Sequence, residues 1–250
     1  MKPTVAVVGL GLVGGSLARA LTRAGYTVVG VDRPEVLRRA RRARAVARTA
    51  ATVERATRDA DVVVLAAGPA TNLRLLRRVA RAAPGALVTD VGSVKGPIAR
   101  AAASLRLRRF VGGHPMAGNE GSGFAASDAD LFRGRTWVLT PVAAAASDVA
   151  RIRRLVKAVG ARPRTLTPAQ HDRAVAFLSH VPQVLAWALR DAARSDRVTT
   201  RQATIAGPGF RDMTRLARSP RSLWREILAQ NRREVARALA AVRRQVARRF

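Results

Sequence analysis

The sequence predicts an α/β protein with a doubly wound parallel sheet in its N-terminal part and an all-helical C-terminal part. Two observations lead to this class. Short apolar runs alternate with helical patterns as far as about residue 165, as in a parallel sheet with helices on both faces. No convincing strand pattern follows that point. We therefore expect two domains, residues 1–165 and residues 166–250.

The expected strands are largely apolar, as strands buried on both faces are. The first, residues 4–8, leads into a glycine-rich loop, and a helix then runs to Ala24. Gly25 ends that helix, because glycine adopts positive φ without strain. Further strands are expected over residues 26–31, 61–66, 86–89 and 137–139, and helices over residues 35–58, 71–83 and 97–105.

The C-terminal part predicts long helices over residues 168–195 and 220–248, joined by the glycine-containing stretch 206–209. The last helix carries an apolar stripe, which consists of Val235, Leu239, Val242 and Val246. This part is too small to enclose a large core alone. We therefore expect it to pack on a second copy of the chain, as a homodimer.

The composition excludes several kinds of site. The chain has 250 residues, of which 48% are hydrophobic, and it has no cysteine. Disulfides, thiolate metal sites and a cysteine nucleophile are therefore excluded. The apolar run at the N-terminus is too short for a signal peptide or a membrane span, so we expect a cytoplasmic protein that does not enter membranes.

The net charge is unusually high, with 46 lysines and arginines against 16 acidic residues, a formal charge of +30. This excess suggests a nucleic-acid partner. However, the arginines are spread along the whole chain, and only 4% of the residues are aromatic, which leaves little for bases to stack on. We therefore interpret the arginines as solvated helical faces that attract anionic ligands, and expect no specific nucleic-acid partner.

The glycine-rich loop has the spacing of a dinucleotide-binding fingerprint. Gly9, Gly11 and Gly14 follow a buried strand and open a helix. Their expected roles are a tight turn, a close approach of backbone to the pyrophosphate, and close packing of helix on strand. This context predicts a Rossmann domain whose helix N-terminus stabilises the cofactor phosphates, with Leu12 and Val13 also in the binding loop.

The residues after the second strand bear on the choice of cofactor. Asp32 ends that strand and is expected to accept hydrogen bonds from the adenosine ribose. Its charge would repel a 2′-phosphate, which favours NAD over NADP. Arg33 could instead reach a 2′-phosphate, so NADP remains an alternative.

A histidine-containing segment lies downstream of this fingerprint. His114, one of three histidines, lies in a stretch dense with glycine that we expect to form a turn, near Glu120 and Ser122. A neutral imidazole can accept a hydroxyl proton while hydride leaves the adjacent carbon. Together with a nicotinamide cofactor, this residue suggests the oxidation of an alcohol.

Taken together, the motifs resemble those of the prephenate/arogenate dehydrogenase family of tyrosine biosynthesis. The resemblance implies a Rossmann domain, a helical dimerisation domain, an active site between them, and a small dicarboxylate substrate. The motifs that carry it are residues 9–16, 90–96, 113–118, 171–172, 179–182 and 210–215.

The resemblance also implies roles for individual residues. His114 corresponds to the catalytic histidine that bonds the substrate hydroxyl. Ser93 corresponds to the serine that positions this histidine and the substrate. Arg215 corresponds to the arginine that binds a substrate carboxylate, a task that suits a planar guanidinium. Further residues expected at the substrate site are Glu120, His171, Ser179 and His180, the last of which could equally be structural.

One departure from the family pattern concerns the substrate. The position at which the family often has histidine is Gln183 here, and it corresponds to one that faces the substrate side chain. A neutral amide offers no charge to the amino group of arogenate, which favours prephenate. The predicted reaction is oxidative decarboxylation of prephenate to 4-hydroxyphenylpyruvate with reduction of NAD. No cluster of residues has the spacing of metal ligands, so we expect no metal.

Three alternatives are kept. The first is an arogenate dehydrogenase, which would form tyrosine. The second is another Rossmann reductase with a helical dimerisation domain; the motif around His114 speaks against it. The third is a basic nucleic-acid-binding protein on a decayed Rossmann scaffold, which the joint presence of Asp32, Ser93, His114 and Arg215 disfavours.

Overall fold

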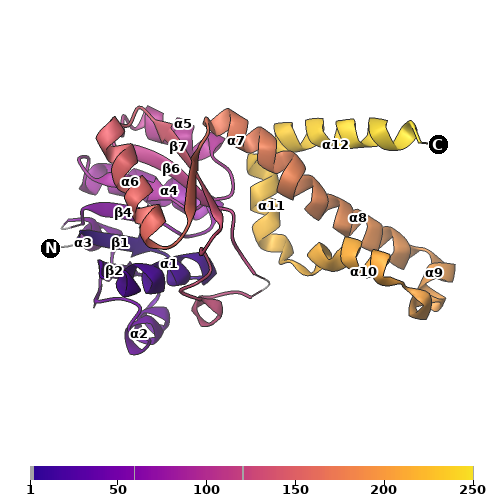
Figure 1. Ribbon diagram of the computed structural model, residues 1–250, viewed down its shortest axis with the longest axis horizontal. Helices are drawn as coiled ribbons and strands as arrows, with labels where there is room; N and C mark the ends of the chain where they lie inside the picture. Colours follow the sequence, from indigo (N-terminus) through magenta and orange to yellow (C-terminus); the bar gives the residue numbers. More distant parts are fainter. Residues whose placement is uncertain (1–2, 59, 120, 250) are drawn as a thin grey trace. The chain divides into compact units, whose positions relative to one another are not determined.

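The computed structural model describes residues 3–58, 60–119 and 121–249. They divide into two compact units, residues 1–171 and residues 172–250. The first unit contains a sheet with helices and the second is helical (Figure 1), which confirms the predicted fold class. No helix in the described ranges is both long and apolar enough to cross a membrane.

An eight-stranded sheet runs through the described part of the first unit, in the order β3-β2-β1-β4-β5-β6-β7-β8. All neighbouring strands are parallel except β6 and β7. The strand order reverses between β1 and β4, and ligands of such sheets bind at the carboxyl ends of the strands beside that point. The strands are β1 (Thr4–Val8), β2 (Thr27–Val31), β3 (Arg48–Thr49), β4 (Val62–Leu65), β5 (Leu87–Asp90), β6 (Phe110–Pro115), β7 (Thr136–Val142) and β8 (Arg162–Thr165).

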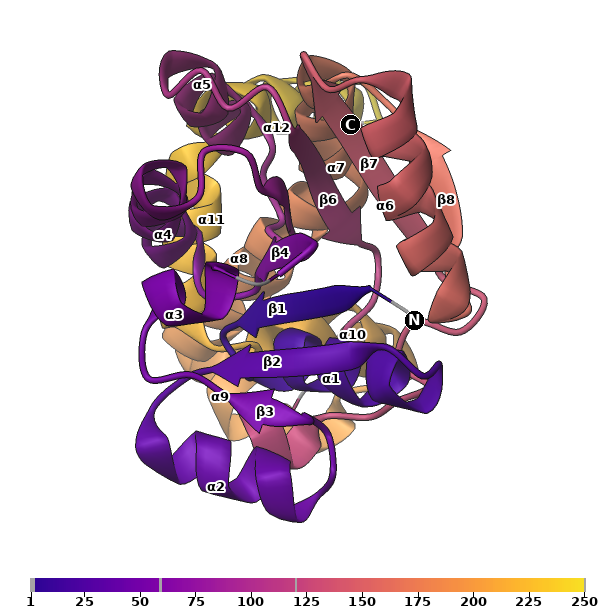
Figure 2. The ribbon, with the colours of Figure 1, turned by 90° about the vertical axis from the view of Figure 1, so that its left-hand side faces the viewer.

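Helices cover both faces of this sheet (Figure 2). Successive side chains of a strand point to opposite faces, so Val5 and Val7 join one apolar core and Ala6 and Val8 join another. The first core is closed by α1 (Leu12–Arg23) and α6 (Ala146–Ala158). The second is closed by α3 (Val53–Thr57), α4 (Pro69–Ala82) and α5 (Gly96–Ser104).

The prediction of one continuous helix over residues 35–58 is wrong, because the middle of this range is not helical. Helix α2 (Pro34–Arg42) ends early, and Arg44 adopts a φ of 50° that no helix continues through. The chain then adds the short strand β3 beside β2 before α3 begins. The many arginines made this stretch look like one solvated helix, whereas Ala45 and Val46 are in fact buried in the core.

The segment that contains His114 begins as strand β6, not as a glycine turn. Its glycines are required by close packing: a Cβ on Gly112 would lie 2.3 Å from Thr140 Oγ1, and one on Gly113 would lie 2.5 Å from the Asp90 carbonyl oxygen. His114 pairs with Val138 in the antiparallel ladder to β7. The strand therefore holds His114 more rigidly than a turn would.

The sheet also extends beyond the prediction. Helix α6 and strand β8 were not predicted, and the sheet is mixed because β7 runs antiparallel to β6. Strand β8 is mostly exposed and carries Arg162 and Arg164, so it lacks the apolar signal of a buried strand. The 3₁₀ turn η1 (Phe124–Ala126) lies in the connection between β6 and β7.

The second unit contains the two helical stretches that were predicted, each with an interruption. The first continues from α7 (Pro168–Val175), which includes the unit boundary, through a π-helical segment and into α8. The second breaks at Asn231. The linking region is also helical. The elements are η2 (Ala176–His180), α8 (Val181–Ser195), α9 (Arg197–Arg201), η3 (Ala203–Ile205), α10 (Pro208–Thr214), η4 (Arg215–Arg218), α11 (Arg221–Gln230) and α12 (Arg232–Ala247).

The core of the second unit is small. Its central cluster of buried apolar residues consists of Ala176, Val181, Val235 and Ala238. Large apolar side chains remain exposed on its surface, among them Leu178 at 77% and Ile205 at 80%. This unit therefore leaves considerable apolar surface uncovered in the single chain.

Candidate active site

The loop between β1 and α1 has the shape of a phosphate cradle. Gly9 has a φ of +96°, and a Cβ there would lie 2.8 Å from the backbone of Ala66. A Cβ on Gly14 would lie 1.9 Å from the Gly9 carbonyl oxygen, so helix and strand meet only because the side chain is absent. A Cβ added at Gly11 would meet no atom within 4 Å, and Gly11 precedes a helix that has no side-chain cap. The open space and the N–H groups of this helix fit a dinucleotide pyrophosphate.

Asp32 is oriented by two backbone donors. Its Oδ2 accepts a hydrogen bond from Leu10 N at 2.6 Å, and its Oδ1 accepts one from Arg33 N at 2.7 Å. Each carboxylate oxygen retains a lone pair for a ribose hydroxyl. The Arg33 side chain is 77% exposed, with its Nε 3.9 Å from Asp32 and 3.6 Å from Glu35.

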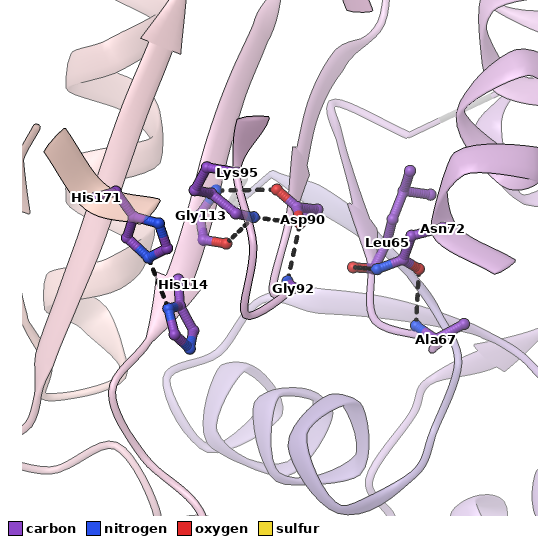
Figure 3. Close-up of polar contacts among 9 residues, drawn as sticks. All are labelled: Leu65, Ala67, Asn72, Asp90, Gly92, Lys95, Gly113, His114 and His171. Atoms are coloured by element: carbon purple, nitrogen blue, oxygen red, sulfur yellow. Dashed lines mark hydrogen bonds and ion pairs between the residues drawn. The ribbon is translucent and has the colours of Figure 1, made fainter. Parts of the chain in front are cut away.

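Asn72, a residue that sequence analysis missed, fixes the loop after β4. Its Oδ1 accepts from Ala67 N at 3.0 Å, and its Nδ2 donates to the Leu65 carbonyl at 3.3 Å (Figure 3). The same loop backs Gly9, so Asn72 supports the cradle from behind. An asparagine buried near the start of an otherwise amphipathic helix is the signal that could have identified it.

A buried ion pair holds the peptide that precedes His114. Lys95 Nζ donates to Asp90 Oδ2 and, at 2.6 Å, to the Gly113 carbonyl (Figure 3). Asp90 Oδ1 in turn accepts from Gly113 N at 3.1 Å, and its Oδ2 accepts from Gly92 N at 2.8 Å. The Asp90 and Lys95 side chains are 1% and 0% exposed. Both polar groups of Gly113 are thus held by charged side chains from the end of β5 and the loop after it.

Ser93 was predicted as a site residue in this loop, whereas Asp90 and Lys95 were not. Two charges flanking an apolar loop, directly after a buried strand, are the signal that could have identified them, because unpaired charges are not buried. Ser93 itself is half-buried, and among the described residues no hydrogen bond joins it to His114.

His114 lies at the carboxyl end of β6, the sheet edge at which β1, β4 and β5 also end. Its Nδ1 lies 2.8 Å from His171 Nε2, and the two rings meet edge to face with an interplanar angle of 73° (Figure 3). Both rings are buried. The structure therefore brings together two of the three predicted histidines in the first unit. Glu120, the predicted acidic neighbour, lies outside the described residues.

The third histidine, His180, lies in the core of the second unit. It is fully buried, and its Nδ1 accepts from Asn231 Nδ2 at 3.1 Å. Asn231 Nδ2 also donates to the Asp172 carbonyl at 2.8 Å, and Trp224 contacts the His180 ring edge to face. Within this unit His180 joins the π-helical segment to the start of α12.

The remaining predicted residues also belong to the second unit. Gln183 is fully buried, and its Nε2 donates to the Leu216 carbonyl at 2.7 Å. Ser179 is half-buried in the π-helical segment, and Arg215 is exposed at the start of η4. Within the described residues, no group of three or more histidine and acidic side chains has the arrangement of a metal site.

The fold and the cradle define a dinucleotide-binding α/β protein with an appended helical unit. Comparison with known families gives a closer assignment. Residues 17–165 match the nucleotide-binding domain of prephenate dehydrogenase, and residues 167–249 match the prephenate dehydrogenase dimerization domain. The chain belongs to the prephenate dehydrogenase family.

Individual relatives agree with this assignment. The prephenate dehydrogenase of Lactococcus lactis is 32% identical over 91% of this chain, and the chain spans 64% of that relative's length. The crystal structure of Synechocystis arogenate dehydrogenase matches with a TM-score of 0.86 and 30% identity, covering 98% of this chain and 90% of that one. The Aquifex aeolicus prephenate dehydrogenase, in complex with hydroxyphenyl propionate and NAD+, matches with a TM-score of 0.87 and 29% identity, covering 99% and 89%.

Proposed function

We propose that this protein is a prephenate dehydrogenase, which converts prephenate and NAD into 4-hydroxyphenylpyruvate, CO2 and NADH. The observation that carries the proposal is the buried His114–His171 pair, at the sheet edge where the glycine cradle also opens, in a chain of this family. The relatives named as prephenate dehydrogenases support the choice of substrate.

In this reaction His114 handles the proton. It accepts the proton of the C4 hydroxyl while hydride leaves the same carbon, and bound NAD supplies the hydride acceptor. Loss of the ring carboxylate as CO2 then makes the ring aromatic. His114 returns its proton to the phenolate oxygen, so the reaction releases no net proton. Arg215 holds a substrate carboxylate, and Ser93 orients the hydroxyl toward His114.

NAD is the proposed cofactor because Asp32 is held in place for ribose hydroxyls and would repel a 2′-phosphate. The NAD+ in the Aquifex aeolicus relative supports this choice. Arg33 is the residue that would favour NADP instead, since its exposed guanidinium could reach a phosphate.

We also propose that the functional chain is a homodimer joined through the helical domain, residues 166–250. The match to a dimerization domain and the exposed apolar side chains of the second unit support this assembly. The expected mass from light scattering is twice 26.7 kDa. The cytoplasmic location expected from the sequence stays a prediction.

Arogenate dehydrogenase activity is the second candidate, favoured by the similarity to the Synechocystis enzyme. Initial rates with the four pairs of prephenate or arogenate and NAD or NADP, followed by absorbance of the reduced nicotinamide, separate the two. We expect the highest kcat/KM for prephenate with NAD. Faster turnover of arogenate would favour the second candidate, and no turnover of any pair would reject both.

A further inference from the structure

We propose that His171 is the positioning residue that sets the tautomer of His114, by accepting a hydrogen bond from the His114 Nδ1–H. This inference rests on the proposed function, in which His114 is the base. It assigns His171 a different task from the substrate contact that the family resemblance suggested.

The geometry is that of a direct hydrogen bond between two rings. His114 Nδ1 and His171 Nε2 are 2.8 Å apart, within the range of a good N–H···N contact. The ring centroids are 5.0 Å apart, with the ring planes at 73°. His171 is 1% exposed and His114 is 8% exposed, so water does not readily replace either partner.

Only one direction of this hydrogen bond leaves His114 able to act as a base. A neutral imidazole carries one proton, so one ring nitrogen donates and the other accepts. If His171 Nε2 carried the proton, His114 Nδ1 would accept it and the His114 proton would sit on Nε2, where no further proton can be taken. If His114 Nδ1 donates to His171, its Nε2 has the lone pair that accepts the substrate hydroxyl proton.

The arrangement resembles a catalytic triad in which the imidazole of His171 takes the place of the aspartate carboxylate. In the serine protease triad an aspartate accepts the Nδ1–H of the catalytic histidine and fixes its tautomer and orientation. His171 supplies the same acceptor here without a fixed negative charge. When His114 gains the substrate proton, its Nδ1–H bond to His171 strengthens, which stabilises the cation at the moment when the oxygen loses its proton.

His171 is held as rigidly as such a role requires. Thr167 and Gln170 form a reciprocal capping box at the start of α7: Thr167 N donates to Gln170 Oε1, and Gln170 N donates to Thr167 Oγ1. Just before this box, Leu166 N donates to the Leu139 carbonyl of β7. Strand β7 also pairs with His114, so both histidines are positioned from the same strand.

Two substitutions separate this role from simple packing. His171→Gln keeps an acceptor, because its Oε1 lies about as far along the side chain as histidine Nε2. His171→Phe fills a similar volume without any acceptor. With prephenate and NAD, we expect His171→Gln to keep kcat within about fivefold. We expect His171→Phe to lose about 10²–10⁴-fold in kcat, with KM for prephenate within about threefold. Equal kcat in the two variants would overturn the proposal.

Nitrogen NMR of protein labelled with ¹⁵N-histidine gives a reading that does not depend on activity. The chain has only three histidines, and His114→Asn identifies the signals of His114 by their loss. We expect His114 to be protonated on Nδ1 in the wild type and to shift its proton to Nε2 in His171→Phe. A wild-type proton on Nε2 would overturn the proposal, and this measurement decides even if His171→Phe does not fold.

The two readings also separate this inference from the proposed function. A wild-type protein with its His114 proton on Nδ1 but no turnover of any substrate pair would reject the proposed function and leave the tautomer assignment standing. A protein that turns over prephenate with the His114 proton on Nε2 would reject the tautomer assignment alone.

Discussion

The buried Asp90–Lys95 pair gives the sharpest stability prediction. Lys95→Met removes the ammonium but keeps a similar apolar length, and it leaves the Asp90 carboxylate buried with only its backbone donors. The Gly113 carbonyl also loses its side-chain donor. Breaking one partner of a buried pair costs about 3–5 kcal/mol, and both side chains here are almost completely inaccessible. We therefore expect the free energy of unfolding of the first unit to fall by about 4 kcal/mol.

Urea unfolding followed by tryptophan fluorescence measures this change. Trp137 lies in the first unit, whereas Trp187 and Trp224 lie in the second. A Trp187→Phe/Trp224→Phe background therefore makes Trp137 the sole reporter of the first unit. With a denaturant slope of about 2 kcal/mol per M, the midpoint should fall by about 2 M. Lys157→Met is the matched control, because the same substitution at an exposed lysine should change stability by less than about 0.5 kcal/mol.

A double-mutant cycle isolates the pair itself. Asp90→Asn combined with Lys95→Met removes both charges, so it should be more stable than the sum of the two single losses by about 2 kcal/mol. A loss of less than about 1 kcal/mol in Lys95→Met, or a coupling energy near zero, would refute the claim that this ion pair holds the strand that carries His114.

Three further predictions follow. Gly11→Ala should keep the wild-type melting temperature but weaken NAD binding several-fold by calorimetry, whereas Gly9→Ala should lower the melting temperature as well, because its φ of +96° and its contacts leave no room for a Cβ. Arg109 holds the pKa of Asp148 below its usual 3.8, and such a carboxylate stabilises the folded state at pH values above its unfolded pKa. Arg109→Gln should therefore lower the free energy of unfolding at pH 7 by about 1 kcal/mol or less, because the pair is partly exposed to solvent. In urea unfolding this difference from the wild type should disappear as the pH falls below 3.8. Asn231→Ala should cost the second unit about 1–3 kcal/mol in urea, because it removes two buried hydrogen bonds; an unchanged midpoint would contradict that role.

The sequence was most informative where local signals and tertiary structure agree. The runs at β1, β2, β4 and β5 were predicted because a parallel strand buried on both faces is largely apolar. The glycines of the cradle were predicted from their spacing between such a strand and a helix. Strand β8 was missed because it is largely exposed at the sheet edge and rich in arginine. The break at Arg44 was hidden by the uniform arginine content of its surroundings.

At the site, too, residues with a local sequence signal were predicted and residues that act through tertiary contacts were not. His114 and the cofactor loop were predicted from motifs, but the residues that hold them in place were not. Asp90, Lys95 and Asn72 act through contacts between strands that are distant in sequence, and their partners are backbone groups without a residue signature. The pairing of His114 with His171, 57 positions later, likewise depends on how β6, β7 and β8 associate.

The proposed activity is tested most directly by the product balance of a single reaction mixture. Purified protein is incubated with prephenate and NAD in a buffered solution, and NADH, CO2 and 4-hydroxyphenylpyruvate are quantified. We expect equal amounts of all three products, and a rate at least about 10²-fold lower in His114→Asn. Absence of these products from the wild-type mixture, or an undiminished rate in His114→Asn, would contradict it.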